Sequence, residues 1–176
     1  RRLVITGAAR QRKTFLLVVL IPGGFPGIYI PSVIGNQAAR VQFDALSLEL
    51  GLWDTSGHGD YDMIRPLTYS ATDVLLMCFS VGSAEEKEKV IRKWMLGVRR
   101  FCPDVPMVLV GIKPEGRNSV HSDLDLASER WQGLDLAKII GALTYIQCNL
   151  ENNKCVGDVV QAVSFSSLFS LAVDNT

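Results

Sequence analysis

The stretch RLVITGAARQRKTFLLVVL, residues 2–20, decides the fold. An apolar run leads into Gly7, and Lys13 and Thr14 open a second apolar run. This is the layout of a strand, a phosphate-binding loop and a helix, in which a glycine normally precedes the lysine. Arg12 stands in the place of that glycine. The stretch therefore predicts a strand-loop-helix unit whose phosphate binding depends on how Arg12 alters the loop.

Arg12 is expected to weaken the loop. In such a loop successive backbone N–H groups point at the phosphate, and glycine permits the torsion angles that this requires. An arginine there must adopt a backbone conformation that costs about 1–3 kcal/mol, or distort the loop. Arg10 and Arg12 add positive charge near a phosphate, but we expect the steric loss to dominate. The alternative is that residues 10–13 form a solvated basic turn.

The composition predicts one domain, residues 1–176, with a sizeable core, because 48% of the residues are hydrophobic and 20% are charged. Basic and acidic residues balance at 18 each, which predicts no nucleic-acid partner.

No apolar run approaches the roughly 18 residues of a membrane span. The end SLAVDNT has no C-a-a-X box and predicts no lipid anchor. The predicted location is the cytoplasm, with membrane association only if a lipidated C-terminus lies outside this chain.

The cysteines predict buried thiols and no metal cluster. Cys78 and Cys148 end or interrupt apolar runs, which is typical of core thiols in a reducing compartment. Cys148 and Cys155 are too far apart for a C-x-x-C site, and the chain has 2 histidines.

Apolar runs of strand length alternate with helical patterns along the chain. The expected strands are 2–6, 73–81, 106–111 and 143–148, and an alternating run over 40–54 predicts two antiparallel strands that turn near 44–45. The expected helices are 83–101 with Ser83 as N-cap, 134–143 and 156–169. This order predicts an α/β domain with helices on both faces of a mostly parallel sheet. The candidate site lies at the carboxyl ends of its strands, in 7–14, 54–62, 111–115 and 148–151.

Four segments give the sequence a specific resemblance. FPGIYIPSV (25–33), LWDTSGHGDYDMIRPLTYSATDVLLMCFSV (52–81), KWMLGVRRFCPDVPMVLVG (93–111) and IGALTYIQC (140–148) resemble the Rho subfamily of Ras-superfamily small GTPases. The resemblance implies the P-loop small-GTPase fold, with a six-stranded, mostly parallel sheet, and a role in signal transduction and cytoskeleton regulation. The segment 116–133 is shorter than the insert helix typical of Rho proteins.

The resemblance implies GTP or GDP with Mg²⁺ as ligands. Several motif positions are retained. The phosphate-binding residues would be Gly7, Ala9, Arg12, Lys13, Thr14 and Gly57, and the Mg²⁺ ligands would be Thr14, Ser32 and Asp54, with Asp54 acting directly or through water. Ser32 keeps the hydroxyl of the family's switch threonine.

The hydrolytic positions are changed. Ala9 replaces a glycine near the γ-phosphate, and His58 replaces the glutamine that orients the attacking water. The resemblance therefore implies impaired catalysis, so whether the chain is an enzyme stays open. His58 as an independent base is the alternative to a solvated side chain.

The base-recognition positions are changed most. Phe25, Lys113 and Glu115 would bind the base, with core packing as the alternative for Phe25. Ile112 replaces the family's asparagine, Glu115 replaces its aspartate after the stiff Pro114, and residues 149–151 replace its S-A-K loop. Each lost charge-assisted hydrogen bond is worth about 1.5–3 kcal/mol.

The surface between the nucleotide elements is less changed. Its residues are Tyr29, Trp53, Asp60, Tyr61, Asp62, Arg65, Pro66 and Leu67. The resemblance implies that this surface meets Rho-type exchange factors, GTPase-activating proteins, the dissociation inhibitor or effectors, and the alternative is internal packing of the switch region.

Two hypotheses follow: a guanine-nucleotide switch with weak binding and very slow hydrolysis, or a nucleotide-free pseudoGTPase that acts through protein contacts. A copy without selected function is a third.

Overall fold

The computed structural model describes residues 1–8, 12–20, 36–43, 46–55, 57, 62–63, 65–114, 123–150 and 155–174. Side chains are described for these residues except 18–20, 36–43, 46–48, 66, 123 and 168–174. The statements below concern this part of the chain.

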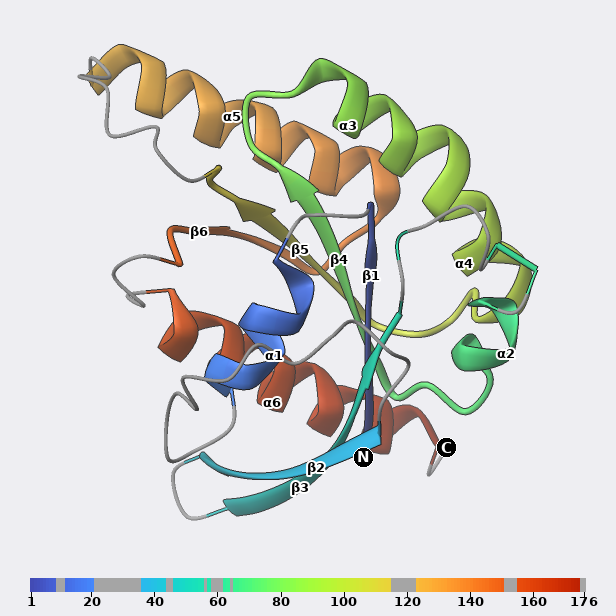
Figure 1. Ribbon diagram of the computed structural model, residues 1–176. Coiled ribbons are helices and arrows are strands. Elements are labelled where there is room, and N and C mark those ends of the chain that lie inside the picture. Colours follow the sequence, from blue (N-terminus) through green and yellow to red (C-terminus); the bar gives the residue numbers. More distant parts are fainter. Residues whose placement is uncertain are drawn as a thin grey trace.

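One six-stranded sheet forms the centre of the molecule, in the order β2-β3-β1-β4-β5-β6 (Figure 1). β2 and β3 pair antiparallel, and every other neighbouring pair is parallel. The predicted fold class is therefore confirmed, including the antiparallel pair on either side of residues 44–45. The strands are β1 (Arg2–Gly7), β2 (Asn36–Phe43), β3 (Leu46–Asp54), β4 (Val74–Ser80), β5 (Met107–Ile112) and β6 (Thr144–Cys148).

Helices cover both faces of the sheet. The segment predicted as a helix over 83–101 consists of three helical elements in succession, and the Ser83 side chain caps it by accepting the N–H of Glu86 at 3.2 Å. No described helix is long and apolar enough to cross a membrane. The helical elements are α1 (Lys13–Leu20), α2 (Arg65–Tyr69), α3 (Ala84–Lys89), η2 (Val90–Trp94), α4 (Met95–Phe101), α5 (Asp123–Ile140) and α6 (Val156–Asp174).

Helix α5 corrects the predicted boundary of 134–143, because it begins at Asp123 and ends at Ile140. The first half of this helix has no apolar stripe facing the core. Residues 124–128 are all exposed, and Leu124 is 81% exposed. A search for hydrophobic periodicity therefore detects only the second half, where Leu136 and Ile140 are buried.

Side chains of the central strands are buried on both faces. Along β1, Leu3 and Ile5 belong to a core with α1 and α6, whereas Val4 belongs to a core with η2, α4 and α5. Figure 1 shows α1 and α6 on one side of the sheet and α3, η2, α4 and α5 on the other. The continuous apolar runs of the sequence follow from this double burial.

The cysteine prediction is half right. Cys78 is a free, fully buried thiol on β4, as predicted. Cys148 is bonded to Cys155, so the prediction of a free thiol there is wrong. The bond joins the end of β6 to the residue before α6, a proximity that sequence spacing does not reveal.

Tyr145 of β6 packs between the sheet and α5. Its ring centre lies 6.2 Å from that of Phe79. A Cβ at Gly133 of α5 would overlap the Tyr145 ring, and a Cβ at Gly111 of β5 would lie 2.5 Å from the Tyr145 hydroxyl. Glycine at these two positions therefore allows α5 to approach the sheet over an aromatic ring.

We expect Gly133→Ala to destabilise the fold by about 1–3 kcal/mol, because the new methyl group overlaps a ring held between two elements. Gly157→Ala in α6 is the matched control, since no atom lies within 4 Å of its Cβ position. That change should stabilise the fold by about 0.5–1 kcal/mol through helix propensity. Urea unfolding checks both values, and equal stability of the two variants would contradict the packing assigned to Tyr145.

Candidate phosphate and nucleotide site

The carboxyl ends of the parallel strands bring the predicted phosphate residues together. Gly7 ends β1 with φ 140°, in a region that other residues rarely adopt. Lys13 and Thr14 form the first turn of α1. Asp54 ends β3 beside β1, and Gly57 follows it closely in the sequence. The predicted strand-loop-helix unit is therefore present on both sides of residues 9–11.

Arg12 has a costly backbone conformation, with φ 54°, which is one of the alternatives that the sequence leaves open. Its carbonyl accepts the N–H of Leu16 at 3.0 Å, which is the first bond of α1. Its guanidinium carbon lies 4.3 Å from the centre of the Phe15 ring. The arginine is accommodated at the start of the helix by this contact, and its left-handed backbone costs about 1–2 kcal/mol.

Lys13 is buried, with a residue exposure of 6%, and its Nζ donates to the carbonyl of Ala8 at 2.5 Å. Burial lowers the pKa of the Lys13 ammonium, and the negative charge of the Asp54 carboxylate opposes this shift. An ammonium has three donors, and the single described bond is to a loop carbonyl. The remaining donors suit a phosphate oxygen at this loop.

Thr14 and Asp54 form the oxygen-rich part of the site. The Thr14 hydroxyl donates to Asp54 Oδ2 across the gap between α1 and β3. Burial raises the pKa of the Asp54 carboxyl, and the Thr14 hydrogen bond and the Lys13 charge oppose this shift. A hydroxyl and a carboxylate are ligands that Mg²⁺ prefers, so these two residues fit the predicted metal. Ser32, the third predicted ligand, lies outside the described residues.

Two positions on the predicted base side carry apolar side chains. Ile112 is 3% exposed at the end of β5, and Leu150 is 3% exposed after β6. Both belong to the apolar core that contains α1 and α6, so neither side chain offers a hydrogen bond to a base. The backbone N–H of Lys113 donates to the carbonyl of Cys148 at 2.8 Å, which ties the two changed segments together.

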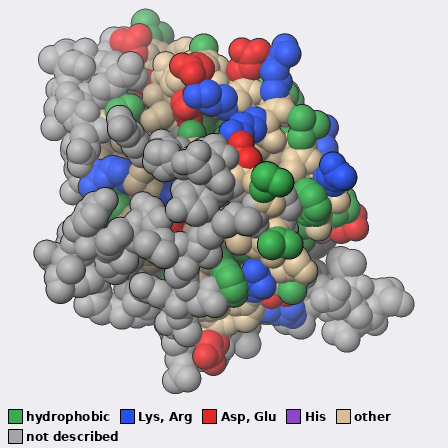
Figure 2. Space-filling view, turned by 45° about the vertical axis from the view of Figure 1, so that its right-hand side comes forward, with side chains coloured by type: hydrophobic (Ala, Val, Ile, Leu, Met, Phe, Trp, Pro, Cys, Tyr) green, Lys and Arg blue, Asp and Glu red, His purple; other side chains and the backbone are tan. Residues whose placement is uncertain are grey.

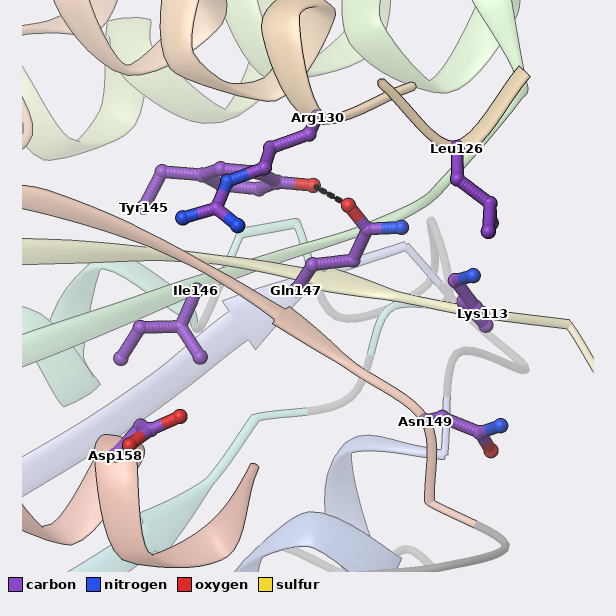
Figure 3. A pocket seen from close by; sticks show the side chains of 8 residues that line it. All are labelled: Lys113, Leu126, Arg130, Tyr145, Ile146, Gln147, Asn149 and Asp158. Atoms are coloured by element: carbon purple, nitrogen blue, oxygen red, sulfur yellow. Dashed lines mark hydrogen bonds between the residues drawn. The ribbon is translucent and has the colours of Figure 1, made fainter. Parts of the chain in front are cut away.

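Lys113 itself points toward α5. Its Nζ lies 4.0 Å from a carboxylate oxygen of Glu129, and that carboxylate also accepts from Gln147 at 3.4 Å. Figure 3 shows Lys113 and Asn149 at one end of a groove along β6. Sequence reasoning missed Glu129, because it lies in the half of α5 that carries no apolar stripe.

Predicted partner-surface residues differ in exposure. Leu67 is 73% exposed and Arg65 is 6% exposed. The guanidinium of Arg65 packs 4.4 Å from the Trp94 ring centre and donates to Asp62. Burial raises the pKa of Asp62, but hydrogen bonds and charges from Lys93 and Arg65 outweigh it and lower that pKa overall.

Trp53 is half-buried, and the guanidinium carbon of Arg2 lies 3.8 Å from its ring centre. Arg2 also donates to the carbonyl of Thr68, so it joins β3 to α2. No motif in the sequence indicated this role for Arg2. Figure 2 shows hydrophobic side chains next to charges of both signs on the side of the molecule that it presents.

Several predicted residues lie outside the described residues, and their predictions stay open. Pro66 lies in α2, but its side chain is not described. The others are Ala9, Phe25, Tyr29, Ser32, His58, Asp60, Tyr61 and Glu115.

A comparison with protein families agrees with this geometry. A family model described as the Ras family matches residues 2–167. The match spans every strand of the sheet and the helix starts that carry Lys13 and Thr14. It thus covers the described residues on both sides of the candidate site.

We expect Arg12→Gly to be more stable than Arg12→Ala by about 1 kcal/mol, because only glycine adopts φ 54° without strain. Both variants lose the contact with Phe15, so the difference between them isolates the backbone. Urea unfolding in the absence of nucleotide measures it. If alanine is as stable as glycine, the left-handed conformation of Arg12 is not present in solution.

Proposed function

This chain belongs to the Ras family of small GTPases, whose members act as nucleotide-binding switches, and we propose that it is a Rho-type guanine-nucleotide switch with weakened binding and very slow hydrolysis. The observation that carries the proposal is the contrast between the two halves of the site. The Thr14 hydroxyl donates to Asp54, and the Lys13 charge acts on the same carboxylate, which supports a phosphate and Mg²⁺ site. Ile112 and Leu150, by contrast, are part of the core.

The phosphate half supports binding of a nucleoside diphosphate or triphosphate. Lys13 would hold phosphate oxygens, and Thr14 and Asp54 would hold Mg²⁺, Asp54 directly or through water. A bound Mg²⁺ would neutralise phosphate charge. The desolvation of Lys13 strengthens its attraction to an anion, because the surrounding core screens charge less than water does. Gly7 at the end of β1 and Gly57 after β3 carry no side chain that would crowd a phosphate there.

The changed residues support the weakening. Ile112 lacks the amide that would hydrogen-bond near the base, and Glu115 replaces the shorter aspartate. Arg12 has a left-handed backbone conformation at the start of α1, which is costly for a residue other than glycine. The resemblance to Rho proteins further supports exchange factors, GTPase-activating proteins, a dissociation inhibitor or effectors as partners, which would meet the surface that includes Leu67. A cytoplasmic location is part of the same proposal.

A second candidate is a nucleotide-free pseudoGTPase that acts as a protein-interaction module. The burial of Ile112 and Leu150 favours it, because the segments that would face the base instead complete an apolar core. Under this candidate Lys13, Thr14 and Asp54 form a closed structural cluster, and function lies on the exposed surface.

Nucleotide content separates the two candidates. We expect protein purified without added nucleotide, then denatured, to release GDP or GTP in less than equimolar amount. Added fluorescent GDP with Mg²⁺ should bind, and Lys13→Met should abolish that binding, because methionine is an unbranched side chain only one atom shorter than lysine and carries no charge. Arg12→Gly should strengthen binding more than His58→Gln, since residue 12 lies inside the loop. Absence of binding by the native chain and by Arg12→Gly would favour the second candidate.

Hydrolysis is expected to stay negligible with a GTPase-activating protein present. Such a partner contributes an arginine that accelerates this reaction by about 10³–10⁵-fold, but it still needs a residue that orients water. His58 and Ala9 do not supply that environment. We expect less than about tenfold acceleration here, measured as phosphate release in a single turnover. The double variant Ala9→Gly with His58→Gln is the control, and it should respond to the same partner. If the partner accelerates hydrolysis by the native chain as much as by the double variant, then the proposal that His58 does not orient the attacking water is wrong.

A further inference from the structure

The outer edge of β6 is open in the described part of the chain. β6 is the last strand of the sheet, and β5 is its one neighbour. The carbonyl of Cys148 accepts from Lys113, so the peptide groups of Cys148 face β5. Peptide groups alternate between the two sides of a strand, so those of Tyr145 and Gln147 face away from β5. No described backbone group bonds to them.

A groove of about 520 Å³ runs along this edge. Figure 3 shows Tyr145 and Arg130 on the α5 side of β6, and Ile146 and Asp158 on the α6 side. Unpaired N–H and C=O groups in a groove are a template for an added strand. The groove therefore provides both the hydrogen-bonding groups and the flanking side chains that strand addition requires.

Two opposite charges lie on the two sides of the groove. Arg130 of α5 and Asp158 of α6 are both exposed, and neither forms an ion pair or a hydrogen bond with another described residue. Successive residues of a strand point to opposite faces. An added strand would therefore match both charges if an acidic residue and a basic residue were neighbours in its sequence.

We propose that the outer edge of β6 binds an extended segment of a partner protein, which adds as a seventh strand and carries neighbouring acidic and basic residues. The acidic residue faces Arg130 and the basic residue faces Asp158. A second copy of β6 fits less well. Symmetric antiparallel pairing would place the α5 helices of both copies on one face, so Arg130 would oppose Arg130, and residues 144–148 carry no charge to match either side.

The test uses a short fluorescent peptide of alternating threonine and valine with a central Glu-Lys pair. The full chain should bind it, and Arg130→Glu or Asp158→Lys alone should weaken binding about fivefold. The double variant should restore binding, because a one-residue shift of the peptide exchanges its faces. Arg99→Glu, an exposed reversal on α4, is the control and should leave binding unchanged. Circular dichroism verifies that each variant is folded.

Two further measurements distinguish strand addition from charge attraction alone. N-methylation of alternate peptide residues should reduce binding more than about tenfold for the set that faces β6 and leave it unchanged for the other set. Amide exchange at Tyr145 and Gln147 should slow when the peptide binds. Equal effects of the two methylated sets, unchanged exchange or no binding would overturn the proposal. A dimer with protected β6 amides that the peptide does not disrupt would assign the edge to a second copy and overturn it as well.

Discussion

The parallel pairing of β1 with β3 and β4 is the constraint on which the rest of the site depends. Ile5 is opposite Asp54, and Gly7 is opposite Cys78, so the three strands end at one edge. The chain then turns from Gly7 into α1, which places Thr14 within hydrogen-bonding distance of Asp54 although 40 residues separate them. A change of register would move a buried carboxylate away from its donor and leave it unpaired in the core.

The phosphate side and the base side of the candidate site differ in what they bury, because one buries charged side chains and the other buries apolar side chains. Lys13 and Asp54 are buried charges, and each has a nearby group that offsets its desolvation. Ile112 and Leu150 occupy positions where an apolar side chain completes the packing against α1 and α6. Burying such residues stabilises the fold by about 1.5–3 kcal/mol each and needs no ligand. Two apolar side chains on the predicted base side thus contribute to the stability of the fold.

The faces of the sheet are covered by helices, whereas the edge strand β6 has a neighbouring strand on one side. Helices cover both faces, and the close approach of α5 over Tyr145 depends on Gly133. No described helix lies across the edge of β6, and no described backbone group bonds to its outward peptide groups between Arg130 and Asp158. Within the described residues, the side chains that pack the two faces of the sheet therefore leave the outer edge of β6 without a backbone partner.

Local pattern was enough to determine the strands, the Ser83 cap, the strained Arg12 and the unit that carries Lys13, because each depends on residues close together in the chain. Only the tertiary structure decided the start of α5, the bond between Cys148 and Cys155, the burial of Arg65 under Trp94 and the pairing of Lys113 with α5. The physical reason is the same in each case. These features arise from contacts between elements, and an exposed helix or a buried arginine leaves no periodic signal in its own segment.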